Sequence, residues 1–311
     1  MMKIKSFKIT FIICLLSVLL SDLYGQQDSQ YTQYMYNTMT FNPAYTGTRD
    51  VFSGLAMYRN QWTGLDGAPE TMNLSMHGPV GNNVGLGLSI TNDKIFIANE
   101  TAIDLMFSYI INLSYRSKLS LGLKAGANLF DIDFSRVNTG SPNGGDPNVQ
   151  YNVDNEFAPQ VGAGAYYYTD KFYAGLSIPN MLETEHFDDS SNSTAGERMH
   201  LYFITGYVFN LSPDIKFKPA TLVKAVSGAP LQVDVSANFL FYDSFSIGAA
   251  YRWDAALSVL TGLQINDRWM VGYAYDWETT SLAQYNKGSH EIFLRFELFK
   301  NYKKVISPRF F

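Results

Sequence analysis

The stretch LQVDVSANFLFYDSFSIGAAYRW, residues 231–253, holds two runs in which apolar residues alternate with small or polar ones. A period of two residues is typical of a β-strand, because successive side chains point to opposite faces. The residues between the runs, 242–244, form only a short polar connection. The stretch therefore predicts two neighbouring antiparallel strands joined by a tight turn.

The same alternation recurs from residue 51 almost to the end of the chain, interrupted by turns rich in Gly, Asn, Asp and Pro. We count fourteen predicted strands. They span residues 51–62, 70–78, 83–93, 100–113, 117–132, 156–168, 171–178, 199–210, 215–225, 230–241, 244–253, 256–265, 268–277 and 288–298.

The two faces of these strands differ in a way that favours a membrane barrel over a soluble sandwich. One parity is almost free of charge and carries Tyr and Trp near the strand ends, whereas the other carries Gly, Ser and scattered charges. A charge on a lipid-facing position costs about 2–4 kcal/mol at the bilayer midplane. Only 16% of residues are charged and 15% are aromatic, against about 25% charged in a typical soluble domain. The sequence thus predicts an all-β fold, a closed transmembrane antiparallel β-barrel of about fourteen strands.

The connections between predicted strands support this assignment. Every second connection is short, and the long ones, 133–155, 179–198 and 278–287, all fall at the other end. Short periplasmic turns and long external loops are typical of outer-membrane barrels, and an even strand count places both ends of the barrel on the periplasmic side. Two irregularities are expected: mixed parity in the first strand, and a bulge or shortening at Pro219, which has no N–H for the ladder.

The chain begins with three lysines followed by an apolar run, Ile9–Leu20, which is too short for a membrane helix. Residues 1–25 are therefore expected to be a secretory signal peptide. The chain's single cysteine, Cys14, lies within it, so the mature protein is expected to lack disulfides. We divide the rest into an N-terminal region (26–50), the barrel (51–298) and a periplasmic tail (299–311), with the protein in the outer membrane.

Residues 30–50, QYTQYMYNTMTFNPAYTGTRD, are not strand-like, yet they hold four Tyr, two Met and a Phe. So many large apolar side chains are unfavourable in water. We expect this segment to be a plug folded into the barrel or a periplasmic cap on it. A partner-binding role is equally open, and it is compatible with either.

No set of residues indicates catalysis. Asp66 and Glu70 share a turn-rich loop, but nothing indicates the buried pocket that would tune an acid–base pair. The four histidines lack zinc-site spacing. Residues 138–157 hold several Asp and Asn side chains that could bind calcium, although a flexible polar loop explains them more simply. We expect no catalytic residues, no cofactor and no metal. A net charge of −5 without basic runs also disfavours nucleic acid as a partner.

Several ordered blocks carry a family resemblance. The blocks QYTQYMYNTMTFNPAYTG, YRNQWTGLDGAPETMNLSMHGP, GLGLSITNDKI and KPATLVKAVSGAPLQVD, with others, resemble the PorP/SprF family of the Bacteroidetes type IX secretion and gliding-motility system. The resemblance runs from about residue 28 nearly to the end. It implies a non-enzymatic outer-membrane barrel that docks or anchors a secreted, adhesin-type surface protein through its type B C-terminal domain. It also implies contacts with the periplasmic and outer-membrane secretion machinery.

On these motifs we expect seven residues to take part in partner binding. They are Asn42, Pro43, Tyr45, Arg59, Trp62, Asp66 and Glu70, the last four being assigned to the first external loop. Two other classes of protein stay open. A passive porin for small solutes would conduct ions and need no protein partner, and an outer-membrane hydrolase would depend on its histidines.

Overall fold

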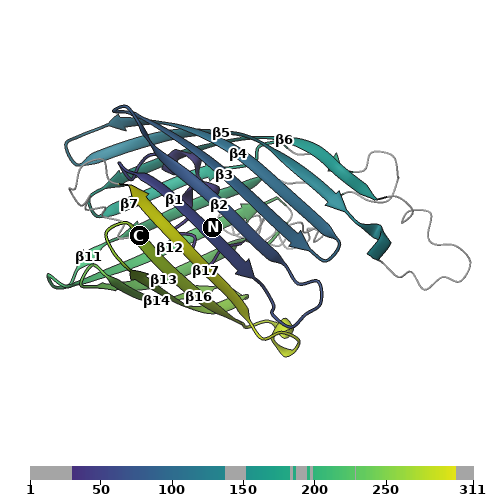
Figure 1. Cartoon of the computed structure of the whole chain (residues 1–311). Helices are drawn as coiled ribbons and strands as arrows, with labels where there is room; N and C mark the ends of the chain where they lie inside the picture. Colours follow the sequence, from purple (N-terminus) through teal and green to yellow (C-terminus); the bar gives the residue numbers. More distant parts are fainter. Residues whose placement is uncertain are drawn as a thin grey trace, which may run out of the picture.

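The computed structural model describes residues 30–136, 152–182, 185–186, 195–196, 199–227 and 229–298. The strands form one antiparallel sheet that closes on itself, because β1 pairs with β17 and β10 pairs with both β7 and β12 (Figure 1). β10 and β11 are two pieces of one strand, which gives a fourteen-stranded barrel and confirms the predicted fold class. The barrel strands are β1 (Phe52–Asn60), β2 (Glu70–Val80), β3 (Val84–Ile95), β4 (Ala98–Asn112), β5 (Ser117–Ile132), β6 (Val153–Thr169), β7 (Phe172–Ile178), β10 (His200–Tyr207), β11 (Phe209–Asn210), β12 (Ile215–Val226), β13 (Gln232–Phe241), β14 (Phe245–Arg252), β15 (Ala256–Gln264), β16 (Trp269–Glu278) and β17 (Ser289–Leu298).

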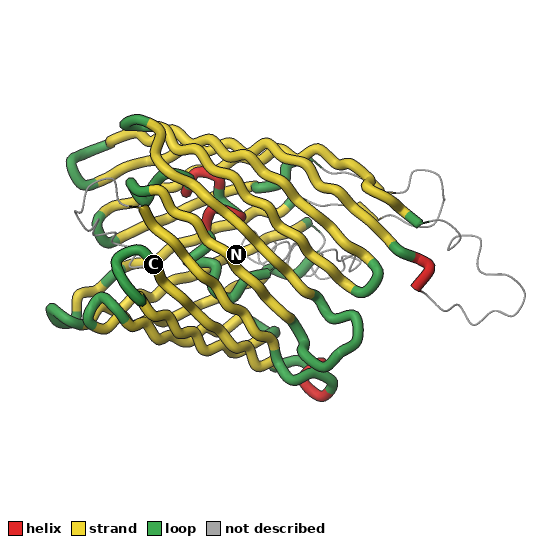
Figure 2. Tube along the Cα trace, viewed as in Figure 1, coloured by secondary structure: helices red, strands yellow, loops and turns green. Residues whose placement is uncertain are grey.

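A few short elements are not part of the barrel wall. The chain between β7 and β10 carries a two-stranded sheet, β8 (Glu185–His186) and β9 (Ala195–Gly196). The helices are single 3₁₀ turns, shown in red in Figure 2: η2 (Thr38–Thr40), η3 (Pro43–Tyr45), η4 (Phe134–Arg136) and η6 (Ser281–Gln284). None of the helices in the described residues is long and apolar enough to span a bilayer.

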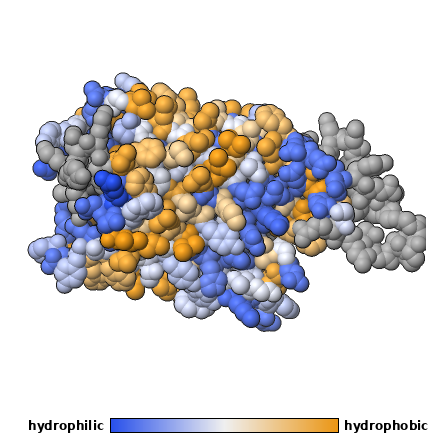
Figure 3. Space-filling view, in the orientation of Figure 1, coloured by the Kyte–Doolittle hydropathy of each residue, from blue (hydrophilic) through white to orange (hydrophobic). Residues whose placement is uncertain are grey.

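The outer face of the wall is apolar, as the alternation in the sequence predicts. Leu105 on β4 and Leu123 on β5 are 63% and 60% exposed, and their neighbours along each strand face inward. Apolar residues dominate the middle of the wall in Figure 3, and polar residues gather toward its ends. A continuous apolar surface of this extent is stable only against another apolar phase, and lipid supplies it.

The two ends of the barrel are built differently. One end, which we call the turn end, has the connections 81–83, 113–116, 170–171, 211–214, 242–244 and 265–268. The opposite end, which we call the loop end, has the connections 61–69, 96–97, 133–152, 179–199, 227–231, 253–255 and 279–288. The longest connections all fall at the loop end, on the right in Figure 1. β1 begins at the turn end and β17 ends there, since Phe52 pairs with Leu298.

Aromatic side chains mark both ends of the outer face. At the turn end, contacting rings run from Phe209 through Phe217, Phe239 and Phe241 to Phe245, with centroids 4.8–6.5 Å apart. At the loop end, Trp277 packs edge-on against Tyr275 and Trp253 is largely exposed. Such girdles are expected where a barrel wall meets the two interfaces of a bilayer.

Both expected irregularities have a structural explanation. In β1 the inward positions include Leu55 and Met57, which belong to the buried apolar cluster inside the barrel, so apolar residues occupy both faces and the alternation is lost. At Pro219 the ladder with β13 continues without a shift. The break falls instead in the neighbouring strand, between β10 and β11, where Val208 donates its N–H to the Lys171 carbonyl at 2.8 Å.

Replacing Leu105 by Arg tests the lipid-facing assignment. We expect the L105R variant to lose about 2–4 kcal/mol of folding free energy in lipid vesicles, because the charge would lie near the bilayer midplane. Denaturant titration followed by the heat-dependent gel shift of the folded barrel measures this loss. The matched variant Y115R places the same charge at the fully exposed turn 113–116 and is expected to change little. Equal losses in the two variants would contradict a lipid-covered wall.

Candidate functional site

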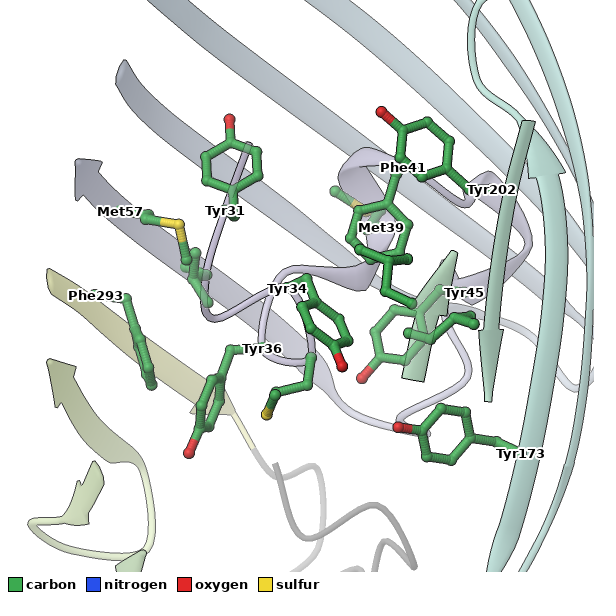
Figure 4. Close-up of a cluster of buried hydrophobic side chains, with 14 of the residues drawn as sticks. Tyr31, Tyr34, Tyr36, Met39, Phe41, Tyr45, Met57, Tyr173, Tyr202 and Phe293 are labelled. Atoms are coloured by element: carbon green, nitrogen blue, oxygen red, sulfur yellow. The ribbon is translucent and has the colours of Figure 1, made fainter. Parts of the chain in front are cut away.

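Residues 30–49, which we call the N-terminal segment, lie inside the barrel against the inward faces of its strands (Figure 4). Nearly every side chain of the segment is buried, and Tyr34 and Met39 are each only 1% exposed. Turns within the segment bond several of its backbone N–H groups to its own carbonyls, as Tyr36 to Gln33 and Tyr45 to Asn42. Inward side chains of the strands are hydrogen-bonded to five further backbone groups, which are the N–H groups of Thr32, Gln33 and Gly47 and the carbonyls of Phe41 and Thr46.

The most polar contact lies near the loop end and centres on Glu291 of β17, which is 1% exposed. Its carboxylate accepts the backbone N–H groups of Thr32 and Gln33, both at 2.8 Å. Arg59 of β1 donates to the same carboxylate at 3.1 Å and to Asp276 of β16 at 2.8 Å. The Thr32 hydroxyl completes the group by donating to Asp276 at 2.7 Å. We call these five residues the Arg59 cluster.

The Arg59 cluster joins three strands to the N-terminal segment. Buried charges are strongly unfavourable unless they are paired and hydrogen-bonded, and here one guanidinium meets two carboxylates. Two backbone donors and a hydroxyl satisfy further lone pairs of the carboxylates. Removing one partner would leave the others uncompensated in a dry interior, so the cluster holds the segment tightly against β1, β16 and β17.

A second ionic contact ties the segment near the turn end. The Arg49 guanidinium lies 2.5 Å from the Glu297 carboxylate of β17, and Arg295 lies 3.8 Å from the same carboxylate. The Gly47 N–H donates to the Nδ1 atom of His77 at 3.0 Å. Residue 50, just after the segment, pairs with Lys118 of β5 at 3.5 Å.

Between these two contacts, the segment is hydrogen-bonded to strands all around the barrel. Asn37 both donates to Asn73 and accepts from Ser75 on β2, at 2.8 and 3.0 Å. Further hydrogen bonds join Phe41 to Ser177, Asn42 to Ala165, Thr46 to Ser108, Tyr34 to Ser236 and Tyr36 to Ser246. The small polar residues on the inward parity of the strands are thus hydrogen-bonding partners for the side chains of the segment and for its carbonyls at Phe41 and Thr46.

Inward glycines give the segment room to approach the wall. A Cβ atom on Gly122 of β5 would lie 2.2 Å from the Ala44 nitrogen, and one on Gly85 of β3 would lie 2.4 Å from the Thr46 carbonyl oxygen. Both contacts are with backbone, which cannot give way as the end of a flexible side chain can. Only glycine therefore allows the observed spacing between wall and segment.

Aromatic side chains fill the remaining volume around the segment. Tyr45 packs edge-on against Tyr166 of β6, with ring centroids 5.5 Å apart, and against His77 at 5.6 Å. Tyr36 packs on Phe293 of β17 at 4.2 Å.

The segment runs lengthwise through the barrel. Its first residue, Gln30, donates to the side chain of Gln232, the loop-end residue of β13, at 2.8 Å. Its last residue, Arg49, contacts Glu297, one residue from the turn end of β17. The chain therefore descends from the loop end to the turn end before it turns back into β1.

The structure divides the seven predicted partner-binding residues into two groups. Asn42, Pro43 and Tyr45 lie together in the N-terminal segment, where Asn42 caps η3 by accepting the Ala44 N–H at 3.0 Å. All three are buried. Arg59 is also buried, at 1% exposure, and it belongs to the inner face of β1 rather than to the first external loop.

The other three predicted residues lie at the loop end. Asp66 is exposed in the connection 61–69, whereas Glu70 is exposed as the first residue of β2 rather than in the loop. Trp62 is half-buried, and its indole N–H donates to Glu278 at 3.1 Å. The seven residues therefore do not form one site.

The sequence analysis missed the acidic residues that hold the segment. Glu291, Asp276 and Glu297 lie on the inward parity of β16 and β17, where a lumen tolerates charge. The available signal was the placement of these carboxylates near strand ends on the inward parity. Periodicity alone assigns them to the interior but does not identify their partners 244 to 259 residues away.

The histidines and acidic loops form no recognisable reactive group in the part of the chain that the structure describes. His290 is hydrogen-bonded to the Tyr273 hydroxyl on the outer face, and the Nδ1 atom of His77 accepts the Gly47 N–H of the N-terminal segment. No group of three or more His, Cys, Asp and Glu residues that could hold a metal ion occurs among the described residues. Most of the loop rich in Asp and Asn, including Asp146 and Asn148, lies outside them.

Comparison with known proteins identifies the chain's family. A model of the family described as type IX secretion system membrane protein PorP/SprF matches residues 23–296. The chain therefore belongs to the PorP/SprF family and is a membrane component of the type IX secretion class, as the sequence motifs predict. A search of curated protein sequences gives no match.

Solved structures give only distant matches. The outer membrane protein Omp33 of Acinetobacter baumannii is 10% identical over 80% of this chain and 98% of its own, with a TM-score of 0.48. The CymD monoaromatic hydrocarbon channel is 11% identical over 90% of this chain and 96% of its own, also at 0.48. The KdgM porin is 8% identical over 79% and 99%, at 0.39.

Replacing Glu291 by Ala tests the Arg59 cluster. We expect the E291A variant to lose about 3 kcal/mol of folding free energy, because two backbone donors and part of the Arg59 charge lose their buried partner. Denaturant titration in vesicles measures the loss. The exposed Glu70 provides the control, and E70A is expected to stay within about 0.5 kcal/mol of the wild type. Similar midpoints for E291A and the wild type would show that the cluster does not stabilise the fold.

Replacing Gly122 by Ala tests the close approach of segment and wall. We expect G122A to displace the chain near Ala44, cost about 1–3 kcal/mol, and expose the tyrosines of the N-terminal segment to chymotrypsin while the barrel stays folded. The control is G54A on β1, whose added Cβ would meet only the Ser75 carbonyl oxygen at an ordinary 3.9 Å. Unchanged cleavage in G122A would contradict the contact.

Proposed function

We propose that the protein is a non-enzymatic outer-membrane component of type IX secretion that docks an exported surface protein. The loop end would face outward and hold that protein, an adhesin-type client, through its C-terminal domain. The turn end would face the periplasm and contact the secretion machinery there. Membership of the PorP/SprF family supports the system, and the apolar wall with its two aromatic girdles supports the location.

The observation that carries the proposal is the filled barrel interior. The N-terminal segment is buried, hydrogen-bonded to two buried carboxylates near the loop end, ion-paired near the turn end, and hydrogen-bonded to strands on all sides. In this role the segment is a plug and not a periplasmic cap. A solute could cross only by displacing it, which means breaking buried charged contacts. A barrel built this way is suited to holding a partner rather than to free diffusion.

The burial of the predicted residues narrows the docking surface. Asn42, Pro43, Tyr45 and Arg59 are enclosed, so we assign them a supporting role inside the barrel. Asp66 and Glu70 are exposed at the loop end, and Trp62 is half-buried in the same connection as Asp66. These three are the residues that we propose to contact the client.

Affinity purification of the tagged protein from native membranes, followed by mass spectrometry, tests the docking role. We expect recovery of a large surface protein containing a C-terminal secretion domain, together with secretion-machinery subunits. The double variant D66N/E70Q is expected to recover several-fold less client and unchanged machinery, because it removes two exposed charges at the proposed surface. The matched variant D214N removes an exposed charge at the turn end and should leave client recovery unchanged.

The alternative outcome is a passive porin. Recovery of the barrel alone from crosslinked membranes, together with steady ion conductance of the purified wild type in a planar bilayer, would contradict the docking role. A wild type that stays closed while a variant lacking residues 30–49 conducts would support the plug.

A further inference from the structure

We infer that Trp62 couples the first connection at the loop end, residues 61–69, to the N-terminal segment inside the barrel. A protein that displaces this connection would weaken the contacts between the Arg59 cluster and the segment. The inference goes beyond the proposed function, because it concerns the closed barrel by itself and holds whichever protein docks at the loop end.

The connection 61–69 is exposed in its middle and hydrogen-bonded at its start. Asp66 is exposed, so an approaching protein can contact the connection without entering the barrel. Thr63 donates its N–H to the Gly288 carbonyl and accepts the N–H of Lys287, both at 2.8 Å. These bonds join the connection to the chain that leads into β17.

Trp62 is hydrogen-bonded to the two neighbouring strands at the loop end. Its backbone N–H donates to the Ser289 hydroxyl of β17 at 3.1 Å, and its indole N–H donates to the Glu278 carboxylate of β16 at 3.1 Å. Its φ angle of 47° lies in the left-handed region, which is unfavourable for a bulky side chain. Such a backbone persists only where the surrounding contacts hold it. Breaking the two bonds would therefore release Trp62 to an ordinary conformation and move the connection.

Both partners of Trp62 lie next to carboxylates of the Arg59 cluster. Glu278 follows Asp276 by two residues on the inward parity of β16, and Ser289 precedes Glu291 by two residues on the inward parity of β17. Two residues of a strand span only about 7 Å. Trp62 itself follows β1, the strand that carries the arginine of the cluster. Trp62 thus joins the ends of the same three strands that hold the N-terminal segment.

The contacts of the Arg59 cluster with the segment depend on the positions of these strand ends. Glu291 accepts the N–H groups of Thr32 and Gln33 at 2.8 Å, and Asp276 accepts the Thr32 hydroxyl at 2.7 Å. Hydrogen bonds weaken steeply when their geometry is lost. Energetic coupling between two sites is carried by hydrogen-bonded networks of this kind. A shift of the strand ends would therefore weaken several contacts of the segment together.

A double-mutant cycle on the purified barrel in lipid vesicles tests the coupling. The reporter is T38C in a C14S background, labelled with a small maleimide. Thr38 is only 2% exposed, and its hydroxyl is hydrogen-bonded to carbonyls of the segment itself, so T38C leaves the contacts with the wall in place. The labelling rate then measures how often the segment opens.

We expect W62F, which removes the indole donor, and E291Q, which weakens the cluster, each to label several-fold faster than the reporter alone. In the double variant W62F/E291Q the increase should fall clearly below the product of the two single increases, because both changes weaken the same contacts. In W62F/E297Q the increases should multiply, because Glu297 lies at the turn end. The matched control W277F removes an exposed tryptophan from the outer face of β16 and should label at the reporter's rate.

The inference would be overturned if W62F labels at the rate of W277F, or if the effects of W62F and E291Q multiply as those of W62F and E297Q do. The heat-dependent gel shift checks that each barrel is folded before labelling. S289A removes the acceptor of the Trp62 backbone N–H and repeats the test through the second bond, with the same expected increase. These rates are measured without any client, so a failure of the docking role would leave them unchanged.

Discussion

An irregular chain enclosed in a barrel must find hydrogen-bond partners for its backbone, and this constraint shapes the whole interior of the protein. The Glu291 carboxylate meets it by accepting two successive N–H groups of the N-terminal segment. Serine side chains on the inward parity meet it at the Phe41 and Thr46 carbonyls. The outward side chains of the strands therefore contact lipid, whereas their inward side chains contact the N-terminal segment.

The same constraint explains the composition of the inward faces. A water-filled lumen would accept almost any polar residue, but a closely packed segment requires particular sizes at particular heights. Glycine occurs where the segment's backbone touches the wall, as at Gly122, and apolar side chains occur where its rings pack, as at Leu55 and Met57. Buried charges such as those of Arg252 and Lys124 meet a partner carboxylate, whereas the ammonium groups of Lys218 and Lys224 lie over tyrosine rings.

The fourteen strands could be predicted from the sequence because each strand has one face against lipid. This requirement selects apolar residues at every second position of every strand, and that pattern is visible locally. The long connections could be assigned to one end for the same reason. The role of Arg59 could not be predicted, because it depends on Asp276 and Glu291, which lie more than two hundred residues away. Its position beside turn-forming residues favoured a loop instead. The aromatic content of residues 30–50 indicated a buried segment. The direction of the segment through the barrel depends on contacts with residues far along the chain, such as Gln30 with Gln232 and Arg49 with Glu297, and these contacts cannot be inferred from periodicity.

The short link between Arg49 and β1 makes the binding of the segment intramolecular. A tethered ligand experiences an effective concentration in the millimolar range for short flexible connections. Individually weak contacts are therefore sufficient to keep the segment in place, and a segment that detached near the loop end would rebind before a free competitor reached it. A partner that opens the interior would have to capture the released chain as well as break its contacts.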